Sequence, residues 1–185
     1  MRIVASEKKQ PFAVWITGLP ASGKSTITRA LTAQLKALGV DAAVLESDEL
    51  RKILTPEPRY DDEERERFYG QMNYIGALLA RHGVPVIFDA TANRRDWRDE
   101  ARGSIANFIE VYVNSPIEVC MARDPKGIYR QGHGGQSSTV PGLQAEYEPP
   151  VNPDVVVQGD REAPESAARR IIATLNGRGW LRAAG

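Results

Sequence analysis

The stretch that decides the fold is Gly18-Leu19-Pro20-Ala21-Ser22-Gly23-Lys24-Ser25-Thr26. It satisfies every fixed position of the pattern G-x-x-x-x-G-K-[ST], which is typical of phosphate-binding P-loops. An apolar, β-rich segment (residues 12–17) precedes it, and a segment with apolar residues at helical spacing (residues 25–38) follows it. A chance glycine turn before a helix is the alternative interpretation, and the complete match in this context argues against it. The pattern therefore predicts a strand, a phosphate-binding loop and a helix in succession.

The residues of this loop have separate expected roles in a nucleotide site. Gly18 and Gly23 let the backbone approach an anion closely, while the loop N–H groups and the helix N-terminus face the phosphates. Lys24 brings a positive charge to the β- and γ-phosphates, and the Ser25 hydroxyl is suited to Mg²⁺. We therefore predict ATP and Mg²⁺ as cofactors and residues 18–26 as the nucleotide-binding loop. Within it, Lys24 is a predicted catalytic residue and Ser25 a predicted metal ligand.

Length and charge restrict the classes of protein to which the chain can belong. Its 185 residues are enough for a sizeable core, and we expect residues 1–185 to form a single domain. The 24 Lys and Arg residues balance the 24 Asp and Glu residues, which argues against nucleic acid as a partner. No apolar run is long enough to span a bilayer, and residues 1–11 form a mixed lead-in without the apolar core of a signal peptide. The expected location is the cytoplasm, with no membrane partner.

Five apolar segments alternate with helical ones along the chain. Strands are predicted at residues 12–17, 42–45, 84–88, 108–113 and 154–157, and helices at residues 25–38, 49–54, 62–82, 94–107, 116–123 and 164–175. In the long third helix, Met72, Ile75, Leu78 and Leu79 are the predicted buried stripe. This alternation is typical of an α/β fold with a doubly wound, five-stranded parallel sheet.

The periodic pattern fails between residues 124 and 153. This segment is rich in Gly, Pro, Ser and Gln, and a stretch of that length inside a compact domain is usually functional or disordered. We predict a mobile lid over the nucleotide site. Arg123 and Lys126 flank its start and are predicted to close on ATP; exposed charges without a function are the alternative.

Polar residues follow two of the predicted strands, at the edge where ligands of open α/β sheets bind. Asp48 is the predicted base that takes the proton of an acceptor hydroxyl, with helix capping as the alternative. Asp89 is predicted to hold a Mg²⁺-bound water, with a turn aspartate as the alternative. Arg51, Arg65 and Arg94 are predicted to bind an anionic acceptor through bidentate contacts, and arginines that only face solvent are the alternative.

Three side chains that often carry chemistry are expected to carry none here. Cys120 is the single cysteine, so no internal disulfide can form, and it is expected on the buried face of a short helix. His82 is expected to end a helix, and His133 lies in a glycine-rich segment. Neither histidine has a partner motif, so we assign neither to catalysis or to metal binding.

The motifs together resemble the adenylylsulfate kinase family of P-loop kinases. Besides the P-loop, Arg123-Asp124-Pro125-Lys126-Gly127-Ile128-Tyr129 is similar to the family's segment that leads into its lid. Pro141-Gly142 and Tyr147-Glu148-Pro149-Pro150 are similar to the segment that leads out of it. The resemblance covers nearly the whole chain. It implies transfer of a phosphoryl group from ATP to the 3′-hydroxyl of adenosine 5′-phosphosulfate, a step of sulfate assimilation that yields ADP and 3′-phosphoadenosine 5′-phosphosulfate.

The departures from the family pattern lie where the acceptor is expected. Glu46-Ser47-Asp48-Glu49-Leu50-Arg51 stands where the family has Asp-Gly-Asp-Asn-x-x-Arg, and only the second aspartate and the arginine match. Thr91-Ala92-Asn93-Arg94 stands where the family has Ser-Pro-Tyr-Arg, and Arg65 alone remains of a longer run. Val140 stands where an aromatic lid residue stacks on adenine. The resemblance implies an acceptor site that contains Arg51, Arg65, Thr91, Asn93, Arg94, Val140 and Gly142.

Three other functions stay open at this point. The altered segments resemble a wider group of P-loop kinases, with polynucleotide kinases, small-metabolite kinases and zeta-type toxins among them, so the acceptor can be another nucleotide-like or anionic hydroxyl compound. A nucleotide-binding regulatory protein without transfer activity would need no base, and Asp48 with Arg51 argues against it. A nucleic-acid 5′-kinase is disfavoured by the balanced charge. The sequence also leaves a homodimer open.

Overall fold

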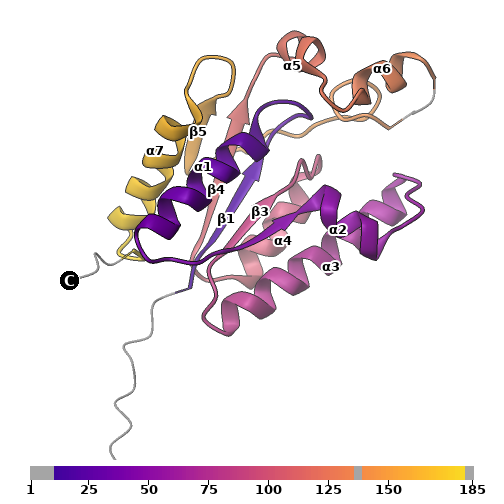
Figure 1. Cartoon of the computed structure of the whole chain (residues 1–185). Coiled ribbons are helices and arrows are strands. Elements are labelled where there is room, and N and C mark those ends of the chain that lie inside the picture. Colours follow the sequence, from indigo (N-terminus) through magenta and orange to yellow (C-terminus); the bar gives the residue numbers. More distant parts are fainter. Residues whose placement is uncertain (1–10, 136–138, 182–185) are drawn as a thin grey trace, which may run out of the picture.

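The fold is built on a five-stranded parallel sheet. In the computed structural model, which describes residues 11–135 and 139–181, the strands are β1 (Ala13–Thr17), β2 (Ala43–Glu46), β3 (Val86–Asp89), β4 (Phe108–Asn114) and β5 (Val155–Gln158). Their order in the sheet is β2-β3-β1-β4-β5, so the strand before the P-loop is central (Figure 1). The predicted doubly wound parallel sheet is confirmed. The predicted lead-in, apart from Pro11, lies outside the described residues.

Helices cover both faces of this sheet. Helices α1 (Lys24–Ala37) and α7 (Pro164–Gly177) lie on one face, and α3 (Asp62–Arg81) and α4 (Arg95–Ser104) lie on the other (Figure 1). Every residue of β1 is buried, because side chains on both of its faces meet a helix layer. Two apolar clusters result, one around Val14 and Ile16 and one around Trp15 and Phe88. The rigid sheet therefore fixes the direction in which the P-loop leaves the core.

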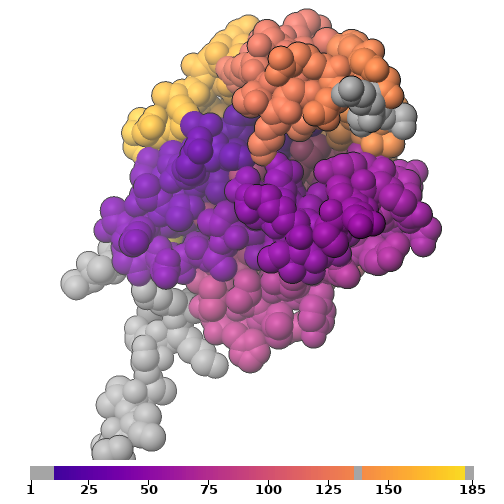
Figure 2. Space-filling view, turned by 45° about the vertical axis from the view of Figure 1, so that its right-hand side comes forward, coloured from indigo at the N-terminus to yellow at the C-terminus, as the bar shows by residue number. Residues whose placement is uncertain are grey.

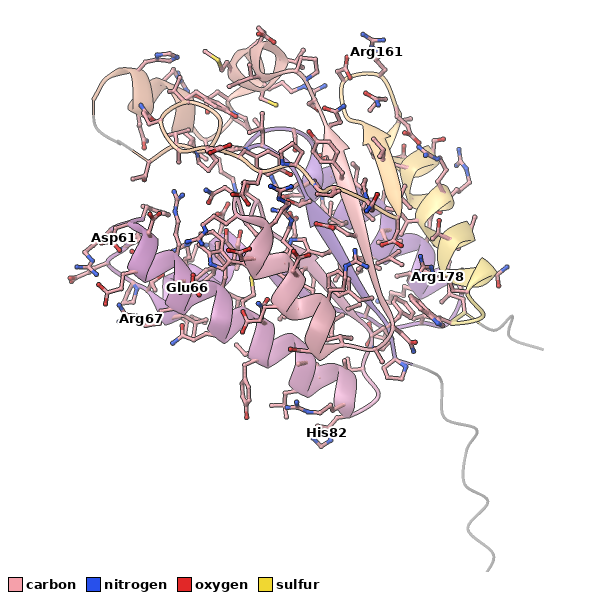
Figure 3. All side chains as sticks on the ribbon, turned by 180° about the vertical axis from the view of Figure 1, so that it is seen from behind. Asp61, Glu66, Arg67, His82, Arg161 and Arg178 are labelled. Atoms are coloured by element: carbon pink, nitrogen blue, oxygen red, sulfur yellow. The ribbon has the colours of Figure 1, made fainter. Side chains whose placement is uncertain are left out.

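Three short helices lie at the carboxyl end of the strands. They are α2 (Ser47–Leu54), α5 (Ile117–Arg123) and α6 (Ile128–His133) (Figure 1). Helix α6 lies inside the segment for which no periodic structure was predicted, since six residues that include Gly132 give too short a pattern to read. Cys120 is buried as expected, and His82 follows the end of α3 away from the lid (Figure 3).

Helix α3 differs from its prediction in the face that it buries. Met72 is fully buried, but Leu78 is 39% exposed, while Phe68, Tyr69 and Ala77 are buried. Gly76 is buried too, and a Cβ built there would lie 2.1 Å from the Phe88 Cζ atom. The backbone of α3 thus approaches the sheet closely at Gly76, and the prediction of a Leu78 contact was wrong.

A buried ion pair joins α4 to the centre of the sheet. Arg98 Nε donates to Glu110 Oε1 at 2.7 Å, and the two side chains are only 1% and 7% exposed. Arg102 lies 3.4 Å from the second Glu110 oxygen and also 3.4 Å from Asp154, which in turn pairs with Arg178 at the end of α7 (Figure 3). The network therefore ties α4, β4, the start of β5 and α7 together.

No helix among residues 11–135 and 139–181 is long and apolar enough to cross a bilayer. The cytoplasmic location stays a prediction.

Removing one charge of the Arg98–Glu110 pair is expected to destabilise the fold. Glu110→Gln leaves the Arg98 guanidinium buried without its carboxylate, and we expect the free energy of unfolding to fall by about 3 kcal/mol. Urea denaturation monitored by circular dichroism measures this change. Glu118→Gln, on the exposed side of α5, is the control and should change stability by less than about 0.5 kcal/mol. Equal stability of the two variants would contradict the assigned role of the pair.

Candidate active site

The P-loop has the backbone geometry that close anion approach requires. Gly18 has φ +153°, and a Cβ there would lie 2.5 Å from the Val113 carbonyl oxygen, so only glycine fits. Gly23 precedes α1 in the left-handed region with φ 109°. Ala21 also has a positive φ of 58°, which is a strained conformation for alanine. The loop is therefore held in a conformation that directs N–H groups and the N-terminus of α1 toward one point.

Lys24 lies against this loop. Its Nζ donates to the carbonyl oxygens of Gly18 at 3.1 Å and Leu19 at 2.9 Å. Burial lowers the pKa of Lys24, while the charges of Asp89 and Asp48 act in the opposite direction. Two uncharged carbonyl oxygens thus hold the ammonium group beside the loop. Negatively charged phosphate oxygens would be stronger acceptors, so a bound nucleotide can replace these two hydrogen bonds.

One cavity of about 970 Å³ brings most of the predicted site residues together. It lies under the overhanging α5–α6 segment, and Figure 2 shows the recess between this orange segment and the purple helix α2. Its lining contains Pro20, Ala21, Gly23, Lys24, Ser25, Thr26, Asp48, Arg51, Arg65, Asp89, Thr91, Asn93, Arg123, Lys126 and Val140. The donor and acceptor residues predicted from separate motifs therefore share one space.

Two predicted acceptor residues lie outside this lining. Arg94 is half-exposed and pairs with Asp96 at 3.0 Å, next to the start of α4. Gly142 has φ +83°, and a Cβ there would lie 2.7 Å from Leu19 Cδ2, so it gives the lid room to pack on the P-loop. Both residues make local contacts in the structure, and their contact with substrate stays a prediction.

Carboxylates gather at the carboxyl ends of β2 and β3. Asp48 lies in the first turn of α2 and pairs with Lys126 of the lid, whereas the N-cap of α2 is Glu46, so the capping alternative for Asp48 is wrong. Glu46 lines the cavity next to Asp89 in the strand register. Burial first, and then the charge of Asp89, raises the pKa of Glu46. Sequence analysis assigned no role to Glu46, because this residue differs from the aspartate that the family has at this position.

Asp89 has the character of a group that faces a cation. Its side chain is buried, and its Oδ2 atom has no hydrogen-bond partner in the described part of the chain. Residues 11–135 and 139–181 contain no group of three or more His, Cys, Asp or Glu side chains that could hold a metal ion. Any cation here would therefore have few protein ligands. This is compatible with Mg²⁺, which usually keeps several water ligands and is bound by one or two carboxylates together with substrate phosphates.

The two buried arginines of the acceptor side have different partners. Arg51 pairs with Glu64, and its guanidinium lies 3.9 Å from the Phe68 ring centroid and 4.9 Å from that of Tyr60. Arg65 donates to uncharged oxygens, as described below, and forms no ion pair within 4.0 Å in the described residues. Glu64 thus offsets the charge of Arg51, while the charge of Arg65 remains free to attract an anion.

Aromatic side chains also line the acceptor side of the cavity. Tyr60 and Tyr69 line the cavity, and the Tyr69 hydroxyl accepts from the Ala92 backbone N–H at 3.0 Å. Phe68 is fully buried beneath Arg51, and the Tyr147 hydroxyl bonds Thr17 outside the lining. Tyr60 has φ +59°, a turn conformation that no residue pattern indicated.

A second wall of the cavity comes from the loop between β5 and α7. Residues 159–164 all line it, and Arg123 Nη1 donates to the Gly159 carbonyl oxygen at 2.9 Å. Arg161 projects from the tip of this loop (Figure 3). Sequence reasoning missed this loop, and its only signal is its place after the last strand, at the carboxyl edge of the sheet.

The P-loop, the parallel sheet and the cavity at its carboxyl edge define a P-loop kinase. The family model described as adenylylsulphate kinase matches residues 10–158. The adenylyl-sulfate kinase of Rippkaea orientalis is 38% identical over 174 residues, which cover 94% of this chain and 96% of that protein. That of Microcystis aeruginosa is 39% identical over 177 residues, which cover 96% and 98%. The structure of the Mycobacterium tuberculosis APS kinase CysC in complex with AMPPNP and APS aligns with TM-score 0.85 and 29% identity, covering 90% of this chain and 98% of that one.

The chain belongs to the adenylylsulphate kinase family. It is an ATP-dependent kinase that acts on a hydroxyl group.

Loss of the P-loop lysine is expected to abolish phosphoryl transfer without unfolding the protein. Lys24→Ala removes the ammonium group that neutralises transferring phosphate, while its present contacts, to Gly18 and Leu19, lie within the loop. ATP turnover and far-ultraviolet circular dichroism of the variant and the parent measure the two effects. Lys52→Ala, on the exposed side of α2, is the control and should retain parental turnover. Parental turnover of Lys24→Ala would remove the P-loop from the mechanism.

Proposed function

We propose that the chain transfers the γ-phosphoryl group of ATP to the 3′-hydroxyl of adenosine 5′-phosphosulfate. The products are ADP and 3′-phosphoadenosine 5′-phosphosulfate. The observation that carries this proposal is the shared cavity, in which the P-loop, a carboxylate base and a buried unpaired arginine face one another. Membership of the adenylylsulphate kinase family supports this acceptor.

The donor side follows from the P-loop and its neighbours. The loop amides and Lys24 hold the phosphates, and the lid residue Arg123 with residues 159–164 forms the wall that receives the base and ribose. Ser25 would bind Mg²⁺, and Asp89 Oδ2 would accept from one of its waters, since this buried oxygen is unpartnered. When bound, the metal would supply positive charge that offsets the negative charge developing on the transferred phosphoryl group.

On the acceptor side, Asp48 orients the hydroxyl and accepts its proton. Lys126 pairs with Asp48 across the cavity mouth, so the lid lies close to the reacting hydroxyl. Arg65 attracts the anionic group of the acceptor, because no carboxylate of the described residues neutralises it. The Tyr60 ring offers a face for a base.

A kinase for another nucleotide-like or anionic hydroxyl compound is the second candidate. The observation that favours it is Val140, which is 3% exposed and packs with Cys120 and Tyr129 in the lid. An aliphatic side chain in that position offers a base no stacking surface. The oligomeric state stays a prediction.

Replacing the proposed base tests the chemistry. Asp48→Asn keeps the shape of the side chain but cannot take a proton, so we expect kcat to fall by about 10²-fold or more with little change in the KM for ATP. Glu49→Gln, in the same turn of α2 and exposed, is the control and should leave kcat unchanged. If Asp48→Asn lowered the melting temperature and left kcat intact, the residue would be structural only.

The acceptor is tested by titration with adenosine 5′-phosphosulfate at saturating ATP. Gly132 packs closely on Val140, since a Cβ at Gly132 would lie 3.1 Å from Val140 Cγ2. Because Val140 lines the cavity and is packed on its Gly132 side, we expect the ring of Val140→Phe to enter the cavity, where stacking on adenine should lower the KM about tenfold. Val151→Phe, on an exposed residue near the end of the lid and outside the cavity lining, is the control. No turnover in the parent or in Val140→Phe would contradict this acceptor and favour the second candidate.

A further inference from the structure

Asn93 lies where three separate segments of the chain meet. It follows β3 in the turn that leads to α4, and its side chain is nearly buried at the cavity wall. Its Oδ1 accepts from Arg65 Nη1 of α3 at 3.0 Å. Its Nδ2 donates to the Glu146 carbonyl oxygen of the lid at 2.9 Å. Both ends of the amide are therefore engaged within the protein.

Arg65 closes the same arrangement from the other side. Its Nη2 donates to the Thr139 carbonyl oxygen at 2.6 Å, also in the lid. The lid arm 139–148 is thus held at its start by Arg65 and near its end by Asn93, and the Glu148 N–H adds a bond to the Asn93 carbonyl oxygen at 2.8 Å. The two side chains and this arm form one closed ring of hydrogen bonds.

The partners of Arg65 leave its charge available. Burial lowers the pKa of Arg65, with Arg51 acting in the same direction, while Asp62 and Glu64 oppose this shift. Both of its hydrogen bonds go to uncharged oxygens, which fix the guanidinium without neutralising it. An asparagine suits this position because its amide accepts from the arginine and donates to the lid, and carries no charge.

We propose that Asn93 is a positioning residue that aims Arg65 at the anionic group of the acceptor and joins this arginine to the lid arm. The proposal rests on the proposed function, in which the acceptor is an anion bound at Arg65. In this role Asn93 acts through Arg65 and needs no contact of its own with the acceptor. Binding of the anion at Arg65 and closure of the lid arm then depend on the same hydrogen bonds, so the loss of Asn93 weakens both.

Two substitutions of Asn93 separate the effect of a charge beside Arg65 from the loss of the hydrogen bond to the lid arm. Asn93→Asp places a carboxylate beside Arg65 and removes the donor to Glu146, whereas Asn93→Ala removes both contacts and adds no charge. For each variant we expect the KM for adenosine 5′-phosphosulfate to rise at least about tenfold, because a hydrogen bond to a charged group is lost or an anion is repelled. The KM for ATP should stay within about twofold of the parent.

The matched control is Asn107, whose Nδ2 donates to the Pro11 carbonyl oxygen at the opposite end of the sheet. Asn107→Asp and Asn107→Ala should leave the KM for the acceptor unchanged. Hydrogen exchange without ligand gives a second readout. Asn93→Ala should speed the exchange of amides in residues 139–147, whereas a side chain that only touched the acceptor would leave this exchange as in the parent.

The two readouts also separate this proposal from the proposed function. If the parent does not turn over adenosine 5′-phosphosulfate, the proposed acceptor fails, and the hydrogen exchange of Asn93→Ala still decides whether Asn93 anchors the lid arm. Parental exchange in that variant would overturn the proposal in either case. In a parent with turnover, an unchanged acceptor KM in both Asn93 variants would overturn it as well.

Discussion

The geometry of the site depends on one buried charge, the guanidinium of Arg98. Glu110, on the central part of the sheet, neutralises it, and the remaining N–H groups donate to backbone carbonyls of Ala92 and Arg94 and, at 2.7 Å, of Glu148. One buried side chain thereby connects the sheet with the turn after β3 and with the end of the lid. Ala92 has φ +38°, an unfavourable conformation for alanine, and it persists because Arg98 and Tyr69 bind its carbonyl and its N–H group. The turn that carries Asn93 is therefore set by the buried charge of Arg98 and by Tyr69 of the cavity wall.

The parts of the molecule that the sequence predicted are those with local causes. All five strands and the P-loop follow from apolar runs and from a loop whose glycines are required by close contacts, as at Gly18 beside Val113. In a parallel sheet the carboxyl ends of the strands share one edge, so Asp48 and Asp89 could be placed in one cavity from their positions after β2 and β3. Contacts between side chains that lie far apart in the sequence leave no such pattern in the sequence. Nothing local shows that Glu64 neutralises Arg51 while Arg65 keeps its charge.

The lid is less uniform than its composition indicated. It contains α6, and its Tyr129 and Val140 form an apolar cluster with Cys120 of α5, to which Leu19 of the P-loop adds a contact. At the end of the lid arm, the Tyr147 hydroxyl and the Thr17 hydroxyl share a hydrogen bond at 3.1 Å, and Arg98 donates to the Glu148 carbonyl oxygen. Mobility of the segment stays a prediction, and these contacts limit where it can occur. Among the described residues, polar contacts also join the lid to the acceptor side. Lys126 of the lid pairs with Asp48, and Arg65 and Asn93 donate to backbone carbonyl oxygens of the lid arm.

The balance of charges around the cavity sets what the acceptor can be. Asp48, Asp89 and Glu46 face Lys24 and Lys126, and burial together with Asp89 raises the pKa of Glu46, which shows how closely these carboxylates crowd one another. A cation on the donor side, as proposed above, would offset the negative charge of these carboxylates. On the acceptor side Glu64 already neutralises Arg51, whereas Arg65 forms no ion pair with any residue that the structure describes and is left to attract an anion. A single arginine binds an anion tightly only if its guanidinium is held in one orientation. A freely rotating guanidinium would have to be ordered on binding, and the conformational entropy lost would offset the binding free energy. Recognition of the acceptor therefore depends on the neutral groups that hold Arg65, rather than on the number of arginines that the sequence places nearby.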